Sequence, residues 1–280
     1  MRQPVPFYQD DFVTLYNADC FEIAKELGLQ ANMVLTDPPY GCTEQKWDIG
    51  ISWHEFWQMI RNCSKKTAVI TFSINLVGCA EAMATSTVPF RFAWHWRKNK
   101  GTNHLNKKNQ PLRVIEHFPV FCNTTPPYYP QMSEGLPQNF AVSRESNIFN
   151  RTVPVESRTG AKDRFPFNVI EDFPELLISC PVVNNDSSDR IHTNQKPIEL
   201  YEYLILTHTK LGDTVYDGYA GSGNVAKAAR NTGRKAVIVE KSTEQCEKIV
   251  ASLKGEKPHL RPKGLTIEDF INELENEECV

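Results

Sequence analysis

A glycine-rich turn between a strand pattern and a helix pattern restricts the fold of this chain most strongly. The turn reads Asp-Gly-Tyr-Ala-Gly-Ser-Gly-Asn over residues 217–224, and it follows the apolar run 214–216. Glycines at such a junction adopt turns closed to other residues and let the backbone approach a ligand closely. The next apolar run, 235–239, ends in Glu240, whose carboxylate can accept hydrogen bonds from both hydroxyls of a ribose. The two features together are typical of a site for an adenosine-containing cofactor in an α/β protein.

The order of the glycines leaves two cofactor classes open. Gly218, Gly221 and Gly223 have the spacing Gly-x-x-Gly-x-Gly, whereas dinucleotide-binding turns usually have Gly-x-Gly-x-x-Gly. The spacing disfavours NAD but does not exclude a nicotinamide dehydrogenase. S-adenosylmethionine is the other adenosine-containing candidate.

A second motif, Asp-Pro-Pro-Tyr at residues 37–40, directly follows the apolar run 33–36. Its two prolines stiffen the loop and remove two backbone donors, which leaves a rim of acceptors between the Asp37 carboxylate and the Tyr40 ring. This arrangement suits a flat group carrying an NH2, and the carboxyl end of a strand is where open α/β sheets bind ligands. Such dipeptides also mark ordinary turns, so the interpretation depends on the glycine turn occurring in the same chain.

Strand and helix patterns alternate over residues 1–122 and again from residue 192, which predicts a doubly wound, mostly parallel α/β sheet of the Rossmann-like kind. Residues 123–191 differ, because they hold eight of the eighteen prolines and show little periodicity. They are either a disordered connection or a separately shaped module, and their apolar content favours the module. Residues 256–280 are an acidic tail. The expected strands are 13–18, 33–36, 67–72, 90–96, 114–122, 214–216 and 235–239, and the expected helices are 21–27, 53–60, 75–84, 197–210, 224–231 and 242–255.

Residues 36–40 and 217–224 together resemble the motifs of the amino-methyltransferases of DNA, which methylate exocyclic amines with S-adenosylmethionine. The Asp-Pro-Pro-Tyr motif precedes the glycines, and Asn-Gln-Lys-Pro at 194–197 lies just before them, an order that resembles the β-class of this family. The resemblance covers residues 1–122 and 192–255, expected to form the catalytic half and the cofactor-binding half of one class I methyltransferase domain. The segment between them then corresponds to an inserted target-recognition region.

The resemblance implies that Asp37, Pro38, Pro39 and Tyr40 form the catalytic loop. Asp37 and the Pro38 carbonyl would accept both protons of the target amine, and Tyr40 would stack on a base extruded from the duplex. Holding both protons would bias the nitrogen toward a tetrahedral shape, so that its lone pair can attack the sulfonium methyl in line without a covalent enzyme intermediate. The residues implied to bind S-adenosylmethionine are Asp19, Asp37, Lys196, Pro197, Asp217, Gly218, Tyr219, Gly221, Gly223 and Glu240.

The first residue of the catalytic motif also bears on the choice of base. Family members with Asp rather than Ser before Pro-Pro-Tyr usually act on adenine, so the resemblance implies site-specific N6-methylation of adenine in double-stranded DNA. N4-methylation of cytosine and a catalytically inactive DNA-binding relative are the alternatives. One departure is Tyr219, which stands where phenylalanine is usual and should still pack beside the cofactor. A homodimer and a cognate restriction endonuclease are further partners that such an enzyme can have.

The formal net charge of −3 conceals an uneven distribution of charge along the chain. Residues 90–114 contain seven Lys or Arg and no acidic residue, whereas residues 265–280 carry six acidic residues. A basic, polar loop of this kind can contact the phosphates of DNA, although a merely solvated loop would have the same composition. The residues expected to contact DNA are Arg97, Lys98, Lys100, Lys107 and Lys108.

Composition excludes several other classes of protein. Because no run approaches eighteen apolar residues, no transmembrane helix is expected. The eight cysteines form no Cys-x-x-Cys pair and have no zinc-site spacing, so we expect no metal and reduced thiols in a cytoplasmic protein. The resemblance to the DNA amino-methyltransferases implies a bacterial or phage-encoded one.

Overall fold

The computed structural model describes residues 4–39, 41, 50–140, 158–170 and 195–255. A nine-stranded sheet with the order β1-β2-β11-β10-β3-β4-β6-β5-β9 runs through the molecule. The strands from β2 to β4 pair in parallel, as the alternation of strands and helices predicts. The parallel strands are β2 (Val13–Asn17), β11 (Lys235–Glu240), β10 (Thr214–Asp217), β3 (Ala31–Thr36) and β4 (Ser64–Phe72).

The remaining strands complete the two edges of the sheet. β1 (Tyr8–Gln9) pairs antiparallel with β2, and β6 (Arg113–Phe121) pairs antiparallel with β4. β5 (Phe90–Thr102) and β6 form a long antiparallel hairpin. Within the segment 123–191, β9 (Val169–Ile170) joins β5 in parallel, while β7 (Ser133–Phe140) and β8 (Arg158–Arg164) form a separate two-stranded sheet.

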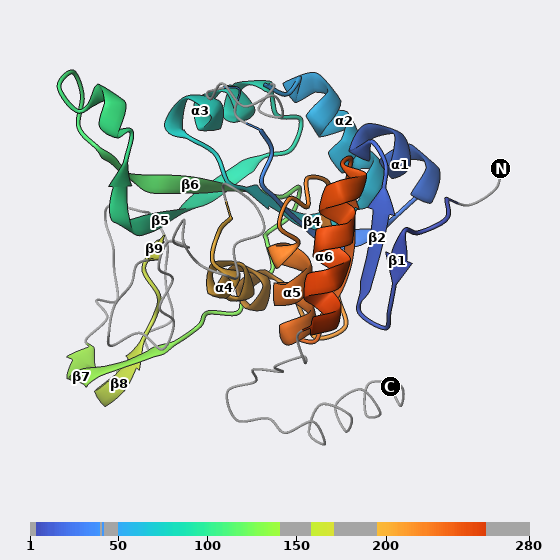
Figure 1. Cartoon of the computed structure of the whole chain (residues 1–280). Coiled ribbons are helices and arrows are strands. Elements are labelled where there is room, and N and C mark those ends of the chain that lie inside the picture. Colours follow the sequence, from blue (N-terminus) through green and yellow to red (C-terminus); the bar gives the residue numbers. More distant parts are fainter. Residues whose placement is uncertain (1–3, 40, 42–49, 141–157, 171–194, 256–280) are drawn as a thin grey trace, which may run out of the picture.

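Helices cover both faces of the sheet (Figure 1). Helices α4, α5 and α6 pack with the sheet in one hydrophobic core that includes Leu204, Val225 and Ile249. Helices α1, α2 and α3 pack on the other face in a second core that includes Phe56 and Tyr216. The helices are α1 (Cys20–Leu27), α2 (Trp53–Cys63), α3 (Leu76–Thr85), α4 (Ile198–His208), α5 (Asn224–Asn231) and α6 (Thr243–Gly255).

Most helix boundaries lie where the sequence places caps. The Ser52 side chain caps α2 by accepting a hydrogen bond from the Glu55 N–H, and Gly28 ends α1 in the left-handed conformation. The largest difference from the expected elements is in β5, which continues through Thr102, although residues 98–110 look loop-like in sequence. Pairing with β6 continues at the far end of this extension, where Thr102 lies opposite Arg113 after an irregularity that begins at Arg97.

Candidate active site

Four carboxylates gather at one edge of the sheet, where neighbouring parallel strands end. Asp19 follows β2, Glu240 ends β11, Asp217 ends β10 and Asp37 follows β3. These four strands are adjacent in that order, so their carboxyl ends meet at the same edge. The structure thus brings together acidic residues from both ends of the chain, as their positions after strand patterns predict.

Asp217 is the most buried carboxylate of this group, with 2% of its surface exposed. Its Oδ1 accepts hydrogen bonds from the Thr36 hydroxyl at 2.6 Å and from the Tyr219 backbone N–H at 3.0 Å. The pKa of Asp217 is raised to about 7, mainly by burial and in addition by the carboxylates of Asp37 and Glu240, whereas the two hydrogen bonds lower it. Carboxylates that oppose each other's ionisation make this edge favourable for a positively charged ligand.

The glycine turn is fixed to Glu240 by hydrogen bonds. The Gly221 N–H donates to Glu240 Oε2 at 3.1 Å, and the Ser242 N–H donates to Oε1 at 2.8 Å. Burial raises the pKa of Glu240, and these backbone donors lower it. Gly223 precedes α5 with φ 73°, and a Cβ there would lie 2.9 Å from Ile249 Cγ2. Both the backbone conformation and the space therefore require glycine at this position.

Asp19 has a structural partner as well as its place at the sheet edge. Its side chain caps α1 by accepting a 2.9 Å hydrogen bond from the Phe21 N–H. Lys241 Nζ lies 3.2 Å from the other carboxylate oxygen. The cap accounts for an acidic residue here without any ligand, and a role toward a cofactor stays a prediction.

Lys196 joins the loop before α4 to the Asp-Pro-Pro-Tyr motif. It is 6% exposed, and its Nζ donates a hydrogen bond to Asp37 Oδ2. Its backbone oxygen accepts a 2.7 Å hydrogen bond from Asn224 Nδ2, which connects it to the glycine turn, and the neighbouring Pro197 is the N-cap residue of α4. Burial opposes the charge on Lys196, but the carboxylates of Asp37 and Glu116 raise its pKa, so the side chain is an ammonium.

Glu116, in β6, also lies beside Lys196. None of the sequence motifs indicates this residue. Its Oε2 lies 3.6 Å from Lys196 Nζ and accepts a 3.2 Å hydrogen bond from Ser73, and its Oε1 lies 2.8 Å from Lys98 Nζ. Burial opposes its ionisation, yet Lys196 and Lys98 hold the pKa of Glu116 at about 2. One signal could have found it, because Glu116 is the only acidic residue between residues 90 and 122.

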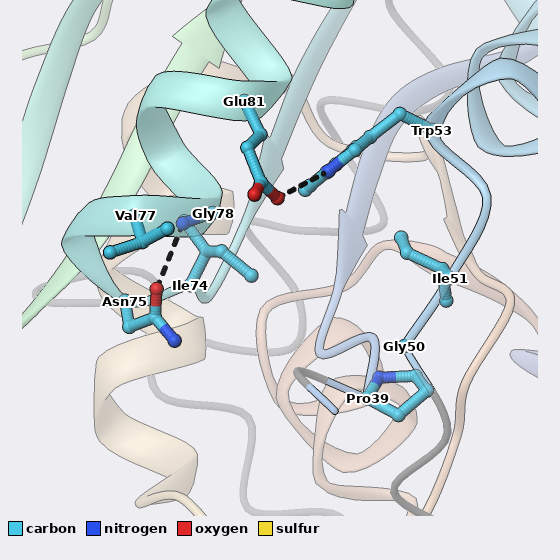
Figure 2. A pocket seen from close by; sticks show the side chains of 9 residues that line it. All are labelled: Pro39, Gly50, Ile51, Trp53, Ile74, Asn75, Val77, Gly78 and Glu81. Atoms are coloured by element: carbon cyan, nitrogen blue, oxygen red, sulfur yellow. Dashed lines mark hydrogen bonds between the residues drawn. The ribbon is translucent and has the colours of Figure 1, made fainter. Parts of the chain in front are cut away.

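A hollow of about 310 Å³ opens beside Pro39 of the Asp-Pro-Pro-Tyr motif. Figure 2 shows Pro39, Ile51 and Trp53 on one side of it, and the side chains of Asn75 and Glu81 on the other. Trp53 Nε1 donates a 3.1 Å hydrogen bond to Glu81 Oε2, which links α2 to α3 across the hollow. The hollow thus has apolar walls with a few polar groups. Tyr40, the last residue of the motif, lies outside the described residues.

The hairpin of β5 and β6, whose tip includes the 3₁₀ helix η1 (His104–Asn106), carries the basic stretch away from the sheet (Figure 1). Arg97, Lys100, Lys107 and Lys108 are exposed, as a role in contacting phosphates requires. Lys98 differs, because it is 8% exposed and its ammonium is paired with Glu116 inside the protein. The geometry therefore argues against the expected phosphate contact by Lys98.

Residues 31–251 match the N6/N4 DNA methylase family. The chain belongs to this family. Among solved structures, it resembles the M1.HpyAVI–SAM complex, with 16% sequence identity, a TM-score of 0.56 and coverage of 86% of this chain and 98% of that one. It also resembles PvuII DNA methyltransferase, which is cytosine-N4-specific, with 14% identity, a TM-score of 0.55 and coverage of 96% and 93%. These similarities confirm the predicted class I methyltransferase fold.

The helices, thiols and acidic groups of this methylase can also be checked for membrane spans, disulfides and metal sites. Within the described ranges, no helix is long and apolar enough to cross a membrane. Five cysteines in those ranges are buried free thiols, and no group of three or more His, Cys, Asp or Glu side chains there could hold a metal ion. The acidic tail, 256–280, lies outside the described residues.

Proposed function

We propose that this DNA methylase transfers a methyl group from S-adenosylmethionine to the N6 amine of adenine at specific sites in double-stranded DNA. The observation that carries the proposal is the position of Asp37 and the two prolines after β3, next to the carboxylates at the ends of β10 and β11. This position sets an acceptor for an amine beside an edge suited to a cationic cofactor.

The residues at the sheet edge fit S-adenosylmethionine. This cofactor carries positive charge on its sulfonium and ammonium groups, and such charge offsets the carboxylates of Asp37 and Glu240, which raise the pKa of Asp217. Glu240 would accept hydrogen bonds from the ribose hydroxyls, and its place at the end of β11 beside the glycine turn supports this role. When bound, S-adenosylmethionine supplies an electrophilic methyl group. The M1.HpyAVI–SAM complex, with the same fold, supports this assignment.

The chain's own residues prepare the amine. An exocyclic amine is a poor nucleophile because its lone pair is delocalised into the ring. Asp37 and the Pro38 carbonyl accept hydrogen bonds from its two N–H groups, and the nitrogen then becomes more nearly tetrahedral and presents its lone pair. Positive charge develops on that nitrogen in the transition state, and the Asp37 carboxylate stabilises it. In this proposal a base extruded from the duplex would lie beside Pro39.

The choice of adenine rests on Asp37 as the first residue of the motif. Cytosine N4 is the second candidate, favoured by the similarity to the cytosine-N4-specific PvuII enzyme. The test is to incubate the protein with PCR-amplified genomic DNA and methyl-labelled S-adenosylmethionine, digest the DNA to nucleosides and analyse them by mass spectrometry. N6-methyladenine is expected. Finding only N4-methylcytosine would change the proposed target from adenine to cytosine. Finding no labelled base at all would overturn the proposal.

A variant separates catalysis from cofactor binding. Asp37→Ala is expected to bind S-adenosylmethionine in calorimetry, with an affinity lowered by the lost charge, and to lose methyl transfer altogether. Glu247→Gln, an exposed substitution on α6, is the control for purification and folding. Turnover by Asp37→Ala equal to that of the unaltered protein would exclude the proposed role of this carboxylate.

A further inference from the structure

Four charged side chains from four parts of the chain form one connected cluster behind the catalytic motif. Asp37 pairs with Lys196, Lys196 lies 3.6 Å from Glu116 Oε2, and Glu116 Oε1 lies 2.8 Å from Lys98 Nζ. Ser73 connects this cluster to β3. Its hydroxyl donates a hydrogen bond to Glu116, and its backbone N–H donates one to the Thr36 carbonyl oxygen at 3.1 Å. The cluster thus connects β6 and β5 with the end of β3.

Stability is a weak explanation for this cluster. Lys196 and Lys98 are 6% and 8% exposed, so both ammonium groups lose most of their hydration on folding. Buried ion pairs seldom repay that loss in full, and well-packed apolar residues often serve stability equally well. The direct contact with the catalytic carboxylate therefore points to a role in the reaction.

Lys196 acts on Asp37 in two opposing ways. Its hydrogen bond to Oδ2 fixes the carboxylate in one orientation, which methyl transfer requires. Its positive charge, however, disfavours the positive charge that develops on the target amine. Glu116 lies on Lys196 from the side of β6 and is ionised across ordinary pH, because its pKa is held at about 2. It can therefore both hold the ammonium in place and offset its charge.

We propose that Glu116 is a positioning residue of the methyl-transfer site, which holds Lys196 so that Lys196 fixes the orientation of Asp37. This inference rests on the proposed function. It assigns Glu116 and Lys98 to the support of catalysis rather than to contact with DNA or cofactor. The expected signature is a lower kcat with little change in the KM for S-adenosylmethionine and in DNA affinity.

The decisive variant balances the buried charges. Glu116→Gln alone leaves two buried ammonium groups with one carboxylate, which endangers folding. The double variant Glu116→Gln/Lys98→Met removes one charge of each sign, so its unfolding temperature should stay close to that of the unaltered protein. If Glu116 positions Lys196, kcat stays about 10- to 100-fold lower in the double variant. If the pair of Glu116 and Lys98 only stabilises the fold, the folded double variant has the original kcat.

Glu116→Asp gives a second, independent measurement. It keeps the negative charge but withdraws the carboxylate by one methylene, so kcat should fall less than in the double variant while both KM values stay unchanged. If the double variant folds, its kcat decides whether Glu116 positions Lys196. If it does not fold, the kcat of Glu116→Asp decides. An unchanged kcat in the deciding variant overturns the inference. Methyl transfer by the unaltered protein is measured in parallel. Its absence would refute the proposed function, whereas its presence with unchanged kcat in the deciding variant would refute only the role of Glu116.

Discussion

Thr36 Oγ1 donates a 2.6 Å hydrogen bond to Asp217 Oδ1, which joins the last residue of β3 to the last residue of β10. Thr36 directly precedes Asp37, and Asp217 opens the glycine turn. Both side chains are almost completely buried. The Asp-Pro-Pro-Tyr motif and the glycine turn are therefore connected by one short hydrogen bond within the sheet.

Removing this hydrogen bond should weaken cofactor binding at neutral pH. Thr36→Val keeps the side-chain shape but removes the donor, which raises the pKa of Asp217 further because the Thr36 hydroxyl lowers it. Fewer molecules then carry the charged carboxylate at pH 7, and affinity for the cationic cofactor falls by about 3- to 10-fold. Calorimetric titrations with S-adenosylmethionine between pH 6 and pH 9 should show affinity recovering at high pH.

Thr71 provides the matched control for this experiment. It is a fully buried threonine on the neighbouring strand β4, and its hydroxyl has no hydrogen-bond partner among the described residues. Thr71→Val therefore removes an unpaired polar atom and should leave binding unchanged and stability equal or higher. Equal cofactor affinities for the two valine variants at pH 7 would contradict the role assigned to Thr36.

The raised pKa of Asp217 also predicts how the stability of the protein depends on pH. Its carboxyl loses its proton near pH 3.8 in the unfolded chain and near pH 7 in the folded protein. Between these values the unfolded state binds fewer protons, so this group's contribution to the free energy of unfolding decreases as pH rises. Asp217→Asn should remove that decrease. Urea unfolding of both proteins at pH 5 and pH 7.5 checks it, and an identical pH dependence would show that Asp217 is not shifted.

The outcome for particular residues shows what local sequence can predict. Asp37, Asp217 and Glu240 each follow a strand pattern, and parallel pairing alone brings such positions to one edge, so their proximity is predictable. Glu116 and Lys98 meet because the long hairpin aligns Trp96 with Glu116, and Lys196 reaches them from a distant part of the sequence. No local periodicity in the sequence indicates which residues of the hairpin lie opposite each other, because that register is fixed only by long-range packing.

Gly223 should resist substitution for two separable reasons. Its φ of 73° strains any residue with a Cβ, and that Cβ would lie 2.9 Å from Ile249 Cγ2. Gly212 has a φ of 75° but nothing within 4 Å of an added Cβ, so Gly212→Ala measures the strain alone. We expect Gly212→Ala to lose about 1–2 kcal/mol in urea unfolding and Gly223→Ala to lose about 1–3 kcal/mol more. Equal losses of stability in the two variants would show that Ile249 in α6 moves to make room for the added Cβ.

The exposed lysines of the hairpin should control the salt dependence of DNA binding. Lys107 and Lys108 are exposed and follow η1 in the turn that joins β5 to β6. If each contacts one phosphate, Lys107→Gln/Lys108→Gln lowers the slope of log affinity against log salt by about 2, since each contact releases roughly one counterion. Fluorescence anisotropy with a duplex between 50 and 200 mM salt measures this slope. Lys210→Gln/Lys235→Gln, at the amino ends of the parallel strands, makes the same change in net charge at the opposite edge, so an equal effect from this control would show that only total charge matters.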